Sequence, residues 1–580
     1  MKNETKSEME NENILTRDNA IRCLFTFDEA RVLVDNKDQS KKESLFYYFR
    51  HALKLLPQDA GIFAVFTDTT LNISNFSLSS KYDRSQRVPS GRCDLFKSFY
   101  LIDTIDINVD LKKVSTLEDS ENPQCFFMYG RPLWSSLLSP SLDNIKGFEP
   151  PSVINLAMDK LVGGTTYTCW KKEFKNNIST VNALAILGPR LCIDIVPQSE
   201  YAPNLVSNFM RFCINISDDR KNIITSMSTE PVLAEASAQI MNDPDINLID
   251  IINALISSLQ NGGVEGGYRG ELVARLLLLK AWDGVYKKLK VPFTRIHYSR
   301  FMTLSVFLKS LLADNAYEKI SSRLKEQVSF TGTEFGKAYI KFTHFISISY
   351  TPDRKDLLDA LIRGVAFSCK RNQKGVDIII PMYIGSLDEK PSEDRISYIL
   401  IKIKNLTKDI KGGGYPQSAT VFLSPSSSDI EKLPHMPFLS LYMQLGSSKE
   451  FFEDPSEIIE TKSAGSRKRK LEEALQNYSI NYNDTRDGFL KRIKNEDNVS
   501  DADIKTFRKY FQVPLAIFGL SSEVYSCLKQ ATTSTSVNDR DLERSFKQLS
   551  TAWVDPTLGG NSKEVEVVKH MIPMEYKMEE

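Results

Sequence analysis

The sequence lacks the features that mark a membrane protein or a secreted, disulfide-rich protein. Its 580 residues contain no run of about 18 apolar residues, so neither a transmembrane helix nor a membrane partner is expected. Residues 1–13 are polar and acid-rich, which argues against a conventional signal peptide. The eight cysteines form no C-x-x-C pair, which suits a reducing compartment and argues against structural zinc. A nuclear or cytoplasmic location is therefore expected.

The chain also lacks net charge, because 74 basic residues balance 74 acidic ones. A nucleic-acid-binding protein needs a positive surface, so any such surface here must be local. One basic cluster lies in the polar stretch 460–500 and consists of Arg467, Lys468, Arg469 and Lys470. Such a cluster indicates nuclear import or a phosphate contact, and the alternative interpretation is a solvated loop.

At this length the chain should form two or three domains. The apolar pattern predicts an α/β protein with a parallel sheet near the N-terminus, a largely helical middle region and a mixed sheet near the C-terminus. Helical spacing in the middle region predicts helices at 199–214 and 270–281, among others. The expected segments are a disordered N-terminus at 1–17, an α/β lobe at 18–150, a helical region at 151–330, a mixed-sheet domain at 331–560 with a polar insert at 460–500, and a C-terminal tail at 561–580.

The most informative stretch is a pair of predicted strands at 375–381 and 398–405. Both are rich in β-branched residues, with turn-forming residues between them. The first carries Asp377, and the second carries Lys402 and Lys404, which share one face because side chains alternate along a strand. A carboxylate beside a lysine suits metal-dependent phosphodiester hydrolysis, since the carboxylate holds a hard cation and the lysine stabilises the phosphorane charge. The alternative interpretation is a structural hairpin with solvated lysines.

This pattern resembles the PD-(D/E)xK restriction-endonuclease-like family, in which an Asp on one strand precedes a Glu-x-Lys or Gln-x-Lys on the next. Asp377 matches the Asp and Lys404 matches the terminal Lys. The resemblance implies a Mg²⁺-dependent nucleic-acid phosphodiesterase. Lys402 departs from the pattern, because it stands where the family has a second metal ligand or a Gln, and a cation cannot ligate a metal. One-metal chemistry and an inactive site therefore both stay open.

Nuclease folds of this class also take a metal-binding Glu from a helix before the Asp strand, and two residues compete for this role. Glu271 opens the predicted helix 270–281, which looks like the family's first helix but lies far from Asp377 in the sequence. Glu334 lies closer to Asp377, although an acid at a helix start is also favoured by the helix dipole alone. We favour Glu271 and keep Glu334 as the alternative.

In the first region, Asp28 and Glu29 end one predicted strand and Thr67 lies near the end of the next. Catalytic groups lie at the carboxyl ends of strands in open parallel sheets. The first strand resembles a Walker B segment of P-loop NTPases, which implies that Asp28 holds magnesium and Glu29 orients water, with Arg131 as a phosphate sensor. However, the chain has no Gly-x4-Gly-Lys-Ser/Thr segment to cradle phosphates. A truncated, degenerate NTPase lobe is therefore expected.

A wider resemblance runs from about residue 20 to 550. The segments 230–236, 264–277, 342–345 and 363–366 are similar to fungal proteins of the Crinkler type, in which a P-loop NTPase module precedes a restriction-endonuclease-like module. This resemblance implies an effector that cleaves nucleic acid, DNA rather than RNA, through a Mg²⁺ site at Asp377. The second hypothesis is a catalytically inactive NTPase-nuclease remnant that binds nucleic acid or a protein partner.

We predict that the chain neither hydrolyses Mg-ATP nor binds it with micromolar affinity, because the backbone N–H groups of a P-loop are missing. Isothermal titration calorimetry with Mg-ATP checks this, with an intact P-loop ATPase as the positive control. Micromolar binding would contradict the interpretation of a degenerate lobe.

Overall fold

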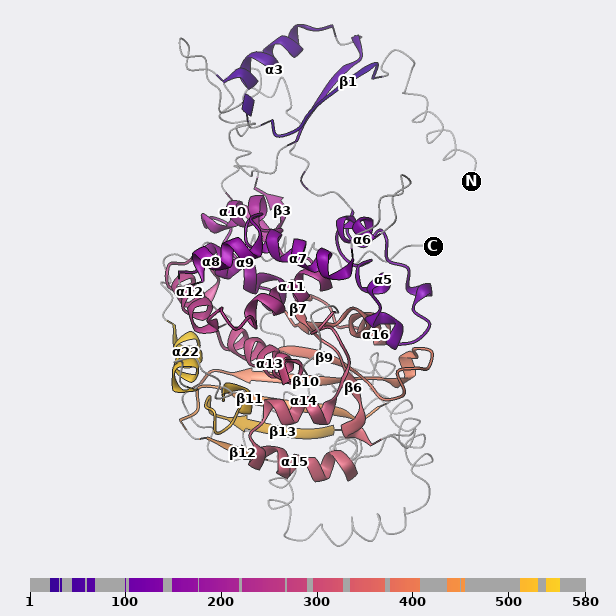
Figure 1. Ribbon diagram of the computed structural model, residues 1–580, viewed down its shortest axis with the longest axis vertical. Helices are drawn as coiled ribbons and strands as arrows, with labels where there is room; N and C mark the ends of the chain where they lie inside the picture. Colours follow the sequence, from indigo (N-terminus) through magenta and orange to yellow (C-terminus); the bar gives the residue numbers. More distant parts are fainter. Residues whose placement is uncertain are drawn as a thin grey trace, which may run out of the picture. The chain divides into compact units, whose positions relative to one another are not determined.

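The structure is a computed structural model with a mixed α/β fold (Figure 1). Several expected features lie outside the residues that it describes: the two terminal segments, the polar insert 460–500, and the cluster Arg467, Lys468, Arg469 and Lys470. None of the helices within the described residues combines the length and apolar character needed to cross a bilayer. The described residues are 21–30, 32–33, 44–57, 60–67, 100, 104–138, 149–175, 177–217, 222–266, 269–288, 296–326, 334–370, 376–406, 436–448, 450–453, 512–529 and 539–552.

The chain divides into two compact units. The first comprises Met1–Ile102 and Pro197–Thr225, and the second comprises Asp103–Val196 and Ser226–Glu580. This division differs from the expected boundaries, because Pro197–Thr225 of the helical region belongs to the first unit, whereas the rest of that region and the C-terminal sheet belong to the second. The sequence pattern could not give this result, since it predicts elements one by one and not which of them bury surface against each other.

In the first unit, two parallel strands and the helix between them form a β-α-β arrangement. β1 (Cys23–Phe27) pairs in parallel with β2 (Ile62–Phe66), which confirms the parallel sheet expected near the N-terminus. The connecting helix is α3 (Leu45–Leu55), as parallel neighbours require a long crossover. It packs on the strands through aromatic rings, with Phe49 edge-on to Phe27 and 4.9 Å between the centroids.

The first unit also contains a correction to the predicted helices. α10 (Tyr201–Asn208) occupies the first half of the helix predicted at 199–214, but β3 (Phe212–Ile216) replaces the second half. Met210 adopts a left-handed φ of 62°, which ends the helix and redirects the chain. β3 then pairs with β4 (Ile223–Ser226).

In the second unit, nine strands among the described residues form one mixed sheet. They are β5 (Met302–Thr303), β6 (Tyr339–Ile340), β7 (His344–Ser347), β8 (Val365–Ser368), β9 (Ile378–Tyr383), β10 (Ile396–Lys404), β11 (Phe438–Gln444), β12 (Phe451–Glu453) and β13 (Gln512–Phe518). Their order is β12-β13-β11-β10-β9-β6-β5, and β8 pairs with both β9 and β7. β9 runs antiparallel to β10, whereas β10, β11 and β13 are parallel neighbours. This sheet confirms the mixed sheet expected in the C-terminal half.

The helices of the second unit cover this sheet and continue above it in Figure 1. Among them, α9 packs against α11 and α12, and α13 packs against α14, α22 and β10. The helices are α5 (Pro123–Phe126), α6 (Pro132–Leu138), α7 (Pro150–Leu161), α8 (Tyr167–Phe174), α9 (Thr180–Leu191), α11 (Pro231–Met241), α12 (Leu248–Gln260), α13 (Arg269–Lys288), α14 (Leu304–Leu311), α15 (Asp314–Glu326), α16 (Arg354–Arg363) and α22 (Asp539–Thr551), with short 3-10 turns at Leu111–Lys113, Glu118–Glu121, Phe335–Lys337, Glu393–Arg395 and Ser526–Leu528.

Different helices cover the two faces of the sheet. β9 and β11 are buried along their whole length, as expected of strands covered on both faces. On one face, Leu361 of α16 belongs to the same buried cluster as Ile379 and Leu400. On the other face, Gly270 at the start of α13 approaches β10 so closely that a Cβ there would lie 3.6 Å from Ile403 Cγ2. The end of β10 is therefore held between α16 and α13.

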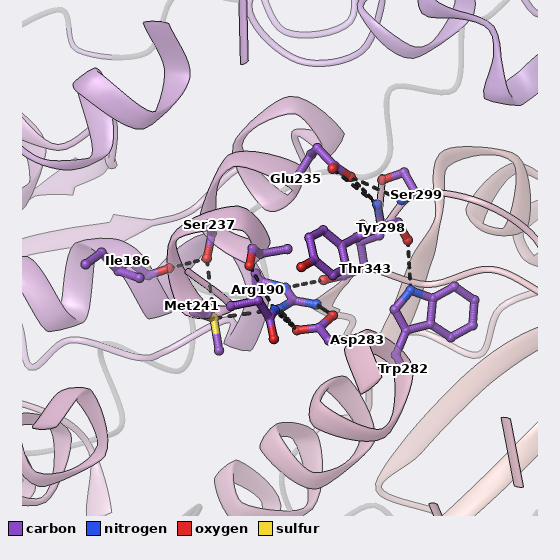
Figure 2. A network of polar contacts seen from close by, with 12 residues as sticks. Ile186, Arg190, Glu235, Ser237, Met241, Trp282, Asp283, Tyr298, Ser299 and Thr343 are labelled. Atoms are coloured by element: carbon purple, nitrogen blue, oxygen red, sulfur yellow. Dashed lines mark hydrogen bonds and ion pairs between the residues drawn. The ribbon is translucent and has the colours of Figure 1, made fainter. Parts of the chain in front are cut away.

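A buried ion pair fixes α13 in this position (Figure 2). Arg190 of α9 is fully buried, and its guanidinium donates to both carboxylate oxygens of Asp283 on α13, at 2.7 and 2.8 Å. The Arg190 Nε also donates to the Thr343 carbonyl at 2.9 Å, in the segment between β6 and β7. One side chain therefore joins two helices to the sheet.

A second buried acid, shown in the same view, fixes the chain that leads into β5 (Figure 2). Glu235 of α11 is fully buried and accepts hydrogen bonds from three consecutive backbone N–H groups, those of His297, Tyr298 and Ser299. The Tyr298 carbonyl in turn accepts from Trp282 Nε1 of α13 at 2.9 Å. These contacts satisfy polar groups that would otherwise be costly to bury.

We predict that Asp283→Ala lowers the free energy of unfolding by about 3–5 kcal/mol, because it leaves the Arg190 charge buried without a partner. Urea unfolding followed by circular dichroism measures this change. The matched control is the double variant Asp283→Ala/Arg190→Met, which removes both charges and should recover most of the loss. Equal stability of the single variant and the wild type would contradict the structural role of this pair.

Candidate functional site

Asp377 lies just before β9, beside the end of β10. β9 and β10 pair antiparallel, and the pairing ends with Ile378 opposite Ile401. Asp377 precedes Ile378, and its N–H donates to the Ile401 carbonyl at 2.9 Å. The two strands expected from the sequence are therefore adjacent, and the backbone of Asp377 bonds to the residue before Lys402, the lysine that departs from the family pattern.

Lys402 and Asp377 form a close ion pair. The Lys402 ammonium lies 2.6 Å from Asp377 Oδ1, and the two side chains are only 12% and 14% exposed. The second carboxylate oxygen, Oδ2, accepts a hydrogen bond from the Ile403 backbone N–H at 2.6 Å. Both carboxylate oxygens of Asp377 thus accept hydrogen bonds from β10. These two bonds hold the carboxylate against the end of that strand.

Two further lysines lie at the same edge of the sheet. Lys404 is half-buried and shares the face of Lys402, two residues further along β10. Within the part of the chain that the structure describes, its ammonium makes no hydrogen bond or ion pair. Lys370 is exposed and follows Cys369, whose N–H donates to the Asp377 carbonyl at 2.8 Å. We call Lys370, Lys402 and Lys404 the lysine edge.

Glu271 approaches this region from the first turn of α13. Burial, the Asp377 carboxylate and the Glu271 carboxylate raise the pKa of the Cys369 thiol, and the Lys402 charge opposes this rise. Both carboxylates therefore lie within electrostatic range of one side chain. However, α13 packs on the Ile403 face of β10, whereas Lys402 points to the opposite face because side chains alternate.

Glu334 lies at the other end of the sheet. It precedes β6, which pairs with β9 at Tyr383 and Met382, whereas Asp377 precedes the opposite end of β9. About 17 Å of extended strand separates these ends. The Glu334 carboxylate instead pairs with Lys337 at 3.2 Å. The structure thus brings Glu271, and not Glu334, into the neighbourhood of Asp377.

The donor set at Asp377 does not fit the magnesium ion expected from the sequence. Mg²⁺ binds through carboxylate oxygens and water and needs at least one carboxylate free to ligate it. Here an ammonium and an N–H group engage Asp377, and Glu271 comes from the helix on the other face. Among the described residues, no group of three or more His, Cys, Asp or Glu side chains is arranged to hold a metal ion.

The residues of the NTPase-like pattern lie in the first unit, apart from Arg131. Asp28 and Thr67 follow β1 and β2, and the Thr67 hydroxyl donates to Asp28 Oδ1 at 2.8 Å. Glu29 adopts a left-handed φ of 49°, and its N–H donates to the Asp28 carboxylate. The parallel register thus brings Asp28 and Thr67 together at the carboxyl ends of their strands, as the sequence predicted.

Arg131 belongs to the second unit and is held by a buried acid there. Its guanidinium lies 2.6 Å from Glu230 Oε1, and Trp134 Nε1 donates to the other oxygen of Glu230 at 2.7 Å. Gly130 precedes it with a φ of 87°, and a Cβ at Gly130 would collide with the Glu230 side chain. These contacts hold Arg131, the expected phosphate sensor, against a buried carboxylate of the second unit.

Sequence reasoning missed a helix with exposed cations, α22, which contacts the chain at the end of β10. The Ser550 carbonyl of α22 accepts a hydrogen bond from Asn405 Nδ2, directly after β10, at 2.6 Å. The exposed side of α22 carries Arg540, Arg544 and Lys547, and Asp541 is exposed as well. Residues spaced by four and three lie on one face of a helix, so this spacing is the signal that could have identified the three cations.

Comparison with known families adds two matches. The model described as Domain of unknown function (DUF8736) matches residues 172–494, which is more than half of the chain. The model described as Domain of unknown function (DUF8735) matches residues 2–102, and its end coincides with the end of the N-terminal part of the first unit. No curated protein and no solved structure was found to match.

We predict that Asp377→Ala lowers the free energy of unfolding by about 2–3 kcal/mol, because it leaves Lys402 unpaired and removes the acceptor of the Ile403 N–H. Chemical denaturation measures the loss. The double variant Asp377→Ala/Lys402→Met should regain most of it, since no charge is then left without a partner. If the single variant unfolds at the same urea concentration as the wild type, the ion pair contributes nothing to stability.

Proposed function

The chain belongs to the family of the domain of unknown function DUF8736, and we propose that it is a catalytically inactive, restriction-endonuclease-like protein that binds nucleic acid. The observation that carries this proposal is the ion pair between Lys402 and Asp377, which engages the carboxylate that a nuclease would use for its metal. DNA is the preferred partner over RNA, and the compartment we propose is the nucleus or the cytoplasm. The cluster 467–470 is the candidate import signal.

Loss of catalysis follows from the chemistry of phosphodiester cleavage. A metal-dependent nuclease needs a divalent cation to activate water and to stabilise charge on the phosphoryl oxygens. Asp377 Oδ1 is 2.6 Å from the Lys402 ammonium, and Oδ2 accepts a hydrogen bond from the Ile403 N–H. An ammonium attracts a phosphate but cannot lower the pKa of a bound water as a metal does. The site therefore keeps affinity for phosphate without the means to cleave it.

Nucleic-acid binding follows from the positive charge gathered at one edge of the sheet. Lys370 and Lys404 extend the charge of Lys402 along the lysine edge, and α22 ends beside it at Asn405. The whole chain is electrically neutral, so this concentration of lysines is local. A basic patch of this kind binds the phosphate backbone through counterion release, with little dependence on base sequence.

α22 carries further cations on the side of the sheet that α13 covers, opposite the face of Lys402 and Lys404. Arg540 and Arg544 are exposed and make no ion pair within the described residues, whereas Lys547 pairs with Glu543 at 2.7 Å. The two arginines lie one helical turn apart and can donate to successive phosphates, although the exposed Asp541 lies between them.

A metal-dependent phosphodiesterase is the second candidate, and the position of α13 is the observation that favours it. Glu271 lies within electrostatic range of Cys369, as does Asp377. Under this alternative, Lys402 would have to leave Asp377 when substrate and metal bind. Cleavage of single- or double-stranded DNA or RNA by the wild type with Mg²⁺ or Mn²⁺ would decide for this candidate and against the inactive protein.

We predict that Lys404→Ala and Lys370→Ala each weaken binding of labelled DNA by about twofold to fivefold and reduce the salt slope by about 1. Fluorescence anisotropy over a series of salt concentrations, with duplex and single-stranded oligonucleotides, measures both quantities. The matched control is Lys337→Ala, which removes an exposed lysine at the other end of the sheet and should change neither. Absence of salt-dependent binding of DNA and RNA by the wild type would refute the proposed function.

A further inference from the structure

We infer that the Lys402 ammonium is a permanent internal cation, which replaces the divalent metal and makes phosphate binding at this site independent of metal ions. This inference deepens the proposed function and rests on it. It follows from the disagreement between the magnesium ion that the sequence pattern implies and the groups that surround Asp377. The residue that blocks the metal is also the residue that supplies the positive charge.

The Lys402 ammonium lies beside the Asp377 carboxylate. Lys402 follows Ile401, the residue of β10 at which the pairing with β9 ends, and Asp377 precedes Ile378, the partner of Ile401. Its Nζ is 2.6 Å from Oδ1, which is a distance at which an ammonium donates a strong, charge-assisted hydrogen bond. A cation held by Asp377 Oδ1 would compete with the ammonium for the same oxygen.

The ion pair between Lys402 and Asp377 is shielded from solvent. Both side chains are nearly buried, at 12% and 14% exposed, so solvent screens their attraction little. The Ile403 N–H fixes the other oxygen of Asp377 and sets the orientation of the carboxylate. A nearly buried carboxylate of this kind needs a compensating charge, and here the chain itself provides it.

Two lysine charges remain at the lysine edge after Asp377 has neutralised Lys402. Asp377 neutralises Lys402, whereas Lys404 makes no ion pair within the described residues and Lys370 is exposed. Glu271 comes from α13 on the other face of β10 and lies within electrostatic range of Cys369. The lysine edge therefore keeps a positive balance without a metal ion, which is what a phosphate requires.

Removal of the internal cation should leave the Asp377 carboxylate open to a metal ion. Lys402→Glu places a second carboxylate beside that of Asp377, which is unfavourable until a cation bridges them. One or two carboxylates with water are sufficient ligands for Mg²⁺, and Mn²⁺ accepts the same oxygen donors. The substitution should therefore create a metal site where the wild type has none.

The test is the melting temperature of the full chain in Mn²⁺ and in EDTA at matched ionic strength. We expect no difference for the wild type. For Lys402→Glu we expect a lower melting temperature in EDTA and a rise of at least about 2 °C in Mn²⁺. The double variant Lys402→Glu/Asp377→Asn is the matched control, and it should lose most of this rise because one of the two facing carboxylates is gone.

Two outcomes would overturn the inference. One is a Mn²⁺-dependent rise in the wild type that Asp377→Asn abolishes, because the native site would then hold a metal. The other is a folded Lys402→Glu protein that does not respond to Mn²⁺. If Lys402→Glu fails to fold, the wild type and Asp377→Asn decide the matter alone, since a wild type that is unresponsive to Mn²⁺ supports the inference.

Anisotropy with labelled DNA separates this inference from the proposed function. If the wild type binds DNA equally well in Mg²⁺ and in EDTA, the result supports both the internal cation and nucleic-acid binding. Wild-type binding that is lost in EDTA overturns the internal cation and leaves nucleic-acid binding intact. Absence of DNA and RNA binding refutes the proposed function, whereas the melting experiment still reports on the cation at Asp377.

Discussion

The ion pair between Arg190 and Asp283 is the constraint on which the geometry of the second unit depends. Both groups are buried, so their charges are tolerable only as a pair with further hydrogen bonds, and the Thr343 carbonyl and the Asn242 amide supply these. Through this pair α13 has one position relative to α9 and to the chain before β7. The eight residues from Leu272 to Leu279 are all buried, which leaves α13 no exposed face along this stretch.

The same helix determines the surroundings of the candidate site. Its first turn lies against the end of β10, where Gly270 permits close contact with Ile403 and Asn405. Asn405 then donates a hydrogen bond to the carbonyl of Ser550, which brings α22 to the end of β10. The surroundings of the lysine edge are thus assembled from α13, β10 and α22, which lie more than a hundred residues apart in the sequence. Buried contacts on both faces of β10 hold that strand in place.

The fold and the site differ in how far local sequence predicts them. The alternation and β-branched residues around Ile378 and Ile401 are local signals, and both strands form where they predict. The helix predicted at 199–214 is wrong in its second half, because the reversal at Met210 leaves no strong local signature. The motif around Arg131 does not predict its ion pair with Glu230, because that partner lies 99 residues away in the sequence.

The sequence by itself determined which chemical groups are available: one aspartate followed by two lysines on the next strand, no P-loop, and no net charge. It also determined that Lys402 and Lys404 share a face, since alternation is a property of any strand. Only the tertiary structure decided that Lys402, and not Lys404, pairs with Asp377, and that Glu271 comes from the opposite face. The reason is that register and helix packing are set by burial of the whole sheet, to which every strand contributes and which no single segment encodes.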